Sequence, residues 1–84
     1  TKRVQMINLF KDVQTIVNSG KDGIYTMSDK LNAMGHKDAE YMSASGVRYV
    51  KVTYKGTPHY VISKNAVEID EDTQIIGAYA VGVI

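Results

Sequence analysis

The stretch that decides the fold is Val47-Arg48-Tyr49-Val50-Lys51-Val52-Thr53-Tyr54-Lys55-Gly56-Thr57-Pro58-His59-Tyr60-Val61-Ile62-Ser63-Lys64. Val, Tyr and Thr dominate this stretch, and these residues favour strands. Residues 55–58 have the composition of a turn, so the pattern predicts a β-hairpin. Because side chains alternate across a strand, one face is predicted to point inward and the other to be solvated. The predicted inward residues of the first arm are Arg48, Val50, Val52 and Tyr54.

The hairpin is also the place where positive charge and aromatic rings occur together. Residues 41–67 contain four cations and no acidic residue, a net charge of +4. Cations that meet phosphates and rings that stack on bases are typical of nucleic-acid-binding surfaces. Lysines on an edge strand also prevent aggregation. The alternative explanation is therefore that these cations are solvated surface residues without a binding role. The residues predicted to contact nucleic acid are Lys37, Arg48, Tyr49, Lys51, Lys55, His59 and Lys64.

The charges that follow the hairpin have the opposite sign. Residues 68–84 contain Glu68, Asp70, Glu71 and Asp72 and no base, a net charge of −4, although the whole chain carries only +1. If the fold keeps the basic and acidic segments apart, the surface is polarised. If the fold brings them together, the charges neutralise each other, and the sequence leaves both alternatives open.

The residues before the hairpin predict helices. Apolar residues at helical spacing predict an amphipathic helix over residues 2–18, which Asn18-Ser19-Gly20 ends. Residues 24–25 are predicted to form a short strand. A capping box with Thr26 as N-cap and Asp29 as its partner then predicts a helix over residues 27–34. A further short helix is predicted over residues 37–45.

The last segment, residues 73–84, is apolar on both faces. A strand of this kind is normally buried on both sides. We expect the first helix to cover one face and a protein partner or a second copy to cover the other, with burial inside the same chain as the alternative. The residues predicted to form this partner interface are Ile76, Ala78, Tyr79, Val81 and Val83.

The order of these elements resembles that of winged helix-turn-helix domains. Residues 25–37 stand in the place of the helix-turn, and residues 47–63 stand in the place of the wing. The resemblance implies a DNA-binding family whose third helix reads the major groove while the wing touches the backbone or minor groove. A small barrel formed by β segments between residues 47 and 84 is a second architecture that fits the pattern.

Composition narrows the classes of function. A chain of 84 residues predicts a single domain, residues 1–84, and the lack of cysteine excludes disulfides and thiolate zinc sites. The same lack favours a cytoplasmic protein. The longest apolar stretch, about ten residues, is too short to span a bilayer. In the motif formed by His36, Asp38 and Glu40, only His36 and Glu40 share a helix face, which is too few ligands for a metal.

These patterns together predict an α+β fold, with an N-terminal amphipathic helix and two short helices followed by a small antiparallel sheet. No catalytic motif occurs in the sequence, so we expect a non-enzymatic protein without a cofactor or metal. The predicted function is a small regulatory protein that binds DNA or RNA through the basic hairpin. The alternative is a protein–protein interaction module, an inhibitor, adaptor, assembly subunit or homodimer, that uses the apolar terminal segment.

Overall fold

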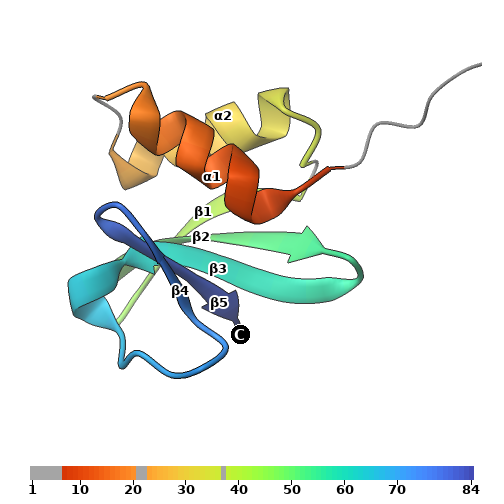
Figure 1. The fold of residues 1–84 in the computed structure, drawn as a ribbon. Helices are drawn as coiled ribbons and strands as arrows, with labels where there is room; N and C mark the ends of the chain where they lie inside the picture. The colour runs from red at the N-terminus through yellow and green to blue at the C-terminus, as the bar shows by residue number, and fades with distance from the viewer. Residues whose placement is uncertain (1–6, 21–22, 37) are drawn as a thin grey trace, which may run out of the picture.

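In the computed structural model, which describes residues 7–20, 23–36 and 38–84, two helices lie on one face of an antiparallel sheet (Figure 1). The sheet has five strands in the order β1-β2-β3-β5-β4, so it is open and has two edges. The predicted α+β class is confirmed, and the predicted barrel is wrong. The elements are α1 (Leu9–Asn18), α2 (Ile24–Ala33), β1 (Glu40–Ala44), β2 (Val47–Tyr54), β3 (Thr57–Ser63), the 3-10 helix η1 (Lys64–Ala66), β4 (Gln74–Ile76) and β5 (Tyr79–Val83).

Helix α1 follows the predicted amphipathic pattern over a shorter range. Leu9, Val13 and Ile16 are buried at a spacing of three or four residues. The helix begins after Asn8, whose side-chain oxygen accepts the Lys11 N–H at 3.0 Å, an N-cap interaction. The prediction of a helix is therefore confirmed for residues 9–18, whereas its part at residues 2–6 lies outside the described residues.

Helix α2 corrects two predictions. Residues 24–25, predicted to be a strand, form the first turn of this helix. Its N-cap is Gly23, and the Thr26 hydroxyl donates to the Gly23 carbonyl at 3.1 Å, so the predicted capping box is wrong. The helix ends at Ala33, close to the predicted end, and Gly35 follows with a φ of 104° in the left-handed region. A Schellman motif closes this end of the helix: the Gly35 N–H donates to the Asn32 carbonyl, and the His36 N–H donates to the Leu31 carbonyl.

The predicted helix over residues 37–45 is wrong, because residues 40–44 form strand β1. Ser45 and Gly46 have φ values of 54° and 78°. Positive φ values at both residues are typical of the two-residue turns that connect the strands of a β-hairpin. Pairing with β2 along the whole of β1 thus overrides the helix propensity of Glu, Met and Ala. The groove-reading helix that the winged-helix resemblance implies is not formed over residues 38–45.

The predicted hairpin over residues 47–64 is confirmed as β2 and β3. Tyr54 pairs with Thr57, and a turn at Lys55 and Gly56 connects the two strands. Val50 and Val52 point toward the helices and are fully buried, as predicted. Arg48 lies on the same side of β2 near the end of the sheet, and it is exposed rather than inward-packed.

The terminal segment is a second hairpin instead of one strand. Gly77 and Ala78 reverse the chain between β4 and β5, so Ile76 pairs directly with Tyr79. This reversal places Ile76, Tyr79 and Val81 on the side of the helices, because directly paired residues share one face of a sheet.

The core lies between the helices and the sheet. It combines the inner stripe of each helix with alternate residues of β2, β3, β4 and β5. Its buried members are Leu9, Val13, Ile16, Met27, Leu31, Ala39, Val50, Val52, Val61, Ile76 and Val81. Among the described residues, no helix is long and apolar enough to cross a membrane.

Candidate functional site

The side of the sheet that faces away from the helices is called here the open face. Tyr49 pairs with Ile62, and Tyr60 pairs with both Lys51 and Gly82. Because their strand neighbours Val50 and Val61 point into the core, these side chains point away from the helices. The open face therefore consists of alternate residues of the sheet strands, including Ile75 of β4, which pairs with Ala80.

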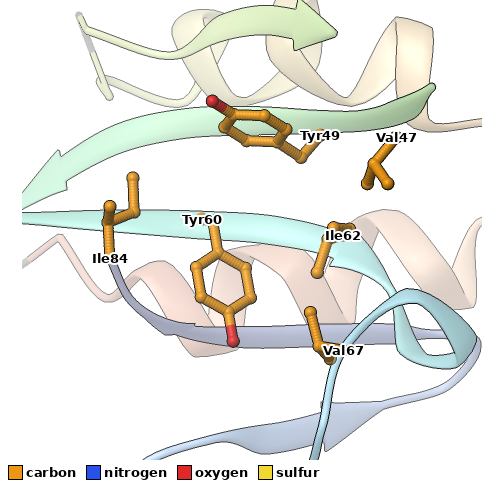
Figure 2. Close-up of a pocket in the computed structure, with 6 residues that line it drawn as sticks. All are labelled: Val47, Tyr49, Tyr60, Ile62, Val67 and Ile84. Carbon is orange, nitrogen blue, oxygen red and sulfur yellow. The ribbon is translucent and has the colours of Figure 1, made fainter. Parts of the chain in front are cut away.

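A shallow cavity of about 260 Å³ lies on the open face (Figure 2). We call it the open-face groove. Ile62 forms its floor and is 6% exposed, whereas Ile84 at one end is 61% exposed. The residues that line it are Val47, Tyr49, Tyr60, Ile62, Val67 and Ile84. Their side chains are aliphatic or aromatic, and their polar groups are the two tyrosine hydroxyls.

This apolar lining is unusual for a sheet face without helices. An antiparallel sheet with one solvated face normally alternates apolar residues inward with polar residues outward. Here the outward positions of β3 and β5 include Ile62 and Ala80, and Ile75 of β4 adds an apolar side chain that is 43% exposed. Ile62 and Ala80 are already buried within the chain, whereas Ile75 and Ile84 leave apolar surface exposed on this face.

Tyr60 connects the groove to the segment that precedes β4. Its ring lies over Gly82, where an added Cβ would be 3.0 Å from the Tyr60 hydroxyl oxygen. The hydroxyl lies 3.5 Å from Thr73 Oγ1, and the Thr73 hydroxyl donates to Asp70 Oδ1 at 2.8 Å. Asp70 Oδ1 also accepts the Asp72 N–H at 3.0 Å, which holds the turn.

We call residues 68–72 the acidic loop. Val67, just before this loop, lines the groove, and Thr73, just after it, contacts Tyr60. Figure 1 shows the segment between η1 and β4 on the opposite side of the sheet from the helices. The acidic loop therefore borders the open-face groove. Its exposed carboxylates belong to Glu68, Asp70, Glu71 and Asp72.

The predicted nucleic-acid contacts are not gathered on one surface. Tyr49 and Lys51 lie on the open face, whereas Arg48 lies on the side of the helices. Lys55 is in the β2–β3 turn, with its Nζ 5.4 Å from the centroid of the Tyr54 ring. Lys64 begins η1 and is exposed. Lys37 lies outside the described residues.

His59 corrects a further expectation, because the sequence placed it on the surface for stacking. It is 7% exposed and lies on the core side of β3. Its ring packs edge-to-face against Phe10 and Tyr54, with centroids 6.1 Å and 5.5 Å away. Its Nδ1–H donates to the Thr57 carbonyl at 2.8 Å. This ring therefore stabilises the fold and is not available for stacking on a base.

The residues predicted for a partner interface also lie in different parts of the fold. Ile76 and Val81 belong to the core, and Tyr79 is partly buried against it. Ala78 is exposed in the β4–β5 turn, and Val83 is 49% exposed at the end of β5. Apolar residues of the same segment that do reach the open face are Ile75, Ala80 and Ile84. A single continuous strand would place Ile75 and Ala80 on opposite faces, whereas the reversal at Gly77 and Ala78 makes them direct partners on one face.

His36 makes a structural hydrogen bond and belongs to no metal-binding cluster among the described residues. It is 4% exposed, and its Nε2–H donates to Asp12 Oδ2 at 2.5 Å, which ties the loop after α2 to α1. No group of three or more His, Cys, Asp or Glu side chains that could hold a metal ion occurs among residues 7–20, 23–36 and 38–84. The open-face groove is therefore the strongest candidate site.

Comparisons of the chain with models of protein families, with curated proteins and with solved structures found no match.

Proposed function

We propose that this protein is an interaction module that holds an apolar segment of another protein in the open-face groove. One observation carries the proposal: the sheet face that lacks helices is lined by apolar side chains where a solvated face would be polar. Burying such a surface against a partner removes apolar area from water, which contributes about 25 cal/mol for each Å².

The shape of the groove supports binding of a side chain or a short segment. Its floor is rigid, because Ile62 is a buried residue on a strand that is paired on both sides. Its rim carries two tyrosines, and tyrosine is enriched at protein interfaces because it combines a large apolar ring with a hydroxyl. A preformed groove of this kind reduces the ordering cost of binding.

Site-specific photocrosslinking in the cells that make the protein tests this function. A benzoylphenylalanine replaces Tyr49 or Ile84 in the groove, and a matched control places it at Gln14, which is exposed on α1. We expect the two groove positions, and not position 14, to give a discrete product with another protein. Identical products from all three positions, no product from the groove, or a product with a second copy alone would overturn the proposal.

Single-stranded nucleic acid is the second candidate, and one arrangement favours it. Tyr49 and Tyr60 lie diagonally across β2 and β3, and Lys51 is the direct neighbour of Tyr60. Rings and a cation so placed are suited to stacked bases and a phosphate. A gel-shift series at low salt, with Tyr49→Ala and Lys51→Ala as variants, tests it. Absence of any shift with DNA and RNA rejects this candidate.

A further inference from the structure

The charges around the open-face groove indicate which kind of partner it takes. On the β1 side, Lys51 pairs directly with Glu40, so this margin carries no net charge. The opposite margin is the acidic loop, with four carboxylates. Together with Lys64 at the start of η1, these segments carry two cations and five carboxylates, a net charge of −3. The whole chain, in contrast, carries +1.

We propose that the open-face groove takes a positively charged amphipathic segment of a partner protein. The proposal rests on the proposed function and adds the chemistry of the partner. Apolar side chains of the segment occupy the groove over Ile62, and its Lys or Arg side chains lie opposite the acidic loop. Complementary charge at the rim guides the approach of the partner and excludes partners of the wrong sign.

The position of the loop supports this role for its carboxylates. Asp70 is occupied by the turn, since its Oδ1 accepts from Asp72 N and from Thr73 Oγ1. Through Thr73 this turn reaches the Tyr60 hydroxyl, so the loop is fixed against the groove. The side chains of Glu68 and Glu71 are exposed, and Glu68 directly follows Val67, which lines the groove.

A second copy of the chain fits this face less well. In a face-to-face dimer with its two-fold axis across the strands, acidic loop would meet acidic loop. With the axis along the strands, the acidic loop would meet the neutral pair of Glu40 and Lys51. Neither arrangement supplies a net positive charge. Phosphates of a nucleic acid would be repelled by the same carboxylates.

Two synthetic amphipathic peptides serve as probes for this preference. They share the same leucines, and their polar positions are all lysine in one peptide and all glutamate in the other. Binding to the whole chain is measured by calorimetry at low and high salt. We expect the lysine peptide to bind and the glutamate peptide not to bind. The affinity of the lysine peptide should fall as salt screens the rim charges.

Substitutions in the acidic loop and in the groove test which residues bind the lysine peptide. Glu68→Gln combined with Glu71→Gln should weaken binding of the lysine peptide about fivefold, since each rim charge contributes modestly. The matched control, Asp29→Asn combined with Asp38→Asn, changes the net charge equally at exposed positions away from the groove and should leave binding unchanged. Ile84→Asn should weaken binding through the groove itself, and its thermal melting verifies that it folds.

The outcomes separate this proposal from the proposed function. Equal binding of both peptides, lost in Ile84→Asn, would overturn the charge preference and leave the groove as a binding site. Equal weakening by the acidic-loop variant and its control would overturn the preference as well. If neither peptide binds, the preference is rejected, and the photocrosslinking result alone decides the proposed function.

Discussion

Val17 of α1 lies directly against Gly77 in the β4–β5 turn, where an added Cβ would be 2.6 Å from Val17 Cγ1. Gly77 also has a φ of 61°, a left-handed conformation that glycine adopts without strain. This contact fixes the terminal hairpin under the first helix. It therefore also fixes the strand β5 that supports the open-face groove.

Gly77→Ala should destabilise the protein by about 3 kcal/mol, because the methyl group adds a clash to the left-handed backbone strain. Gly56→Ala is the matched control, since Gly56 has a φ of 78° but open space where its Cβ would lie. It should cost about 1 kcal/mol from the backbone alone. Urea denaturation measures both values. Equal losses in the two variants would show that the contact with Val17 contributes nothing.

Structural features that depend on local alternation along a strand were predicted from the sequence. Features that depend on pairing with a distant strand were not. Val50 and Val52 were predicted inward and are buried, because both depend only on the period of the strand. Residues 40–44 were predicted helical, yet pairing with β2 makes them a strand. Burial of His59 depends on Phe10, a residue of another element, so no local pattern could indicate it.

The candidate site was predictable in part for the same reason. Tyr49 and Lys51 were predicted on the solvated side of the hairpin, and both lie on the open face. The remaining lining could not be predicted, because Ile84 reaches the groove only through the pairing of β5 with β3. The reversal at Gly77 and Ala78, which changes the face of every following residue, was the missing signal.

Removing the partner of the buried His36 should be costly. Asp12→Ala leaves the His36 Nε2–H without its acceptor, and an unsatisfied buried donor costs about 2 kcal/mol. Asp12→Asn retains a side-chain oxygen and should lose less than half of that. The exposed Asp29→Ala serves as control and should stay within about 0.5 kcal/mol. Thermal and urea unfolding give the three values, and equal stability of Asp12→Ala and Asp29→Ala would refute the prediction.

Ser45 offers a stabilising substitution. Its φ of 54° is in the left-handed region, which asparagine tolerates better than serine and favours at the first position of tight hairpin turns. Ser45→Asn should raise the free energy of unfolding by about 0.5 kcal/mol. Ser43→Asn, within β1, is the control and should not stabilise, since asparagine is depleted in strands. A gain at position 43 as large as that at position 45 would contradict the turn argument.

His59 and Lys51 should differ in what they affect, although the sequence predicted both as contact residues. His59→Ala removes a buried ring from the cluster with Phe10 and Tyr54 and should cost about 2 kcal/mol of stability. Lys51→Ala changes an exposed side chain and should stay within about 0.5 kcal/mol. Chemical denaturation separates them. A stable His59→Ala protein would mean that this ring does not support the hairpin.

Neutralising the acidic loop should promote self-association. The apolar open face would otherwise associate with itself, and the like charges of two loops oppose this approach. Glu68→Gln, Glu71→Gln and Asp72→Asn together should strengthen self-association about tenfold at low salt, measured by sedimentation velocity. High salt should have a similar effect on the unmodified chain, because it screens the same repulsion. Asp70 is left unchanged, because it holds the turn against Tyr60. If the variant and the unmodified chain sediment identically at every concentration and salt, the acidic loop does not keep the open faces apart.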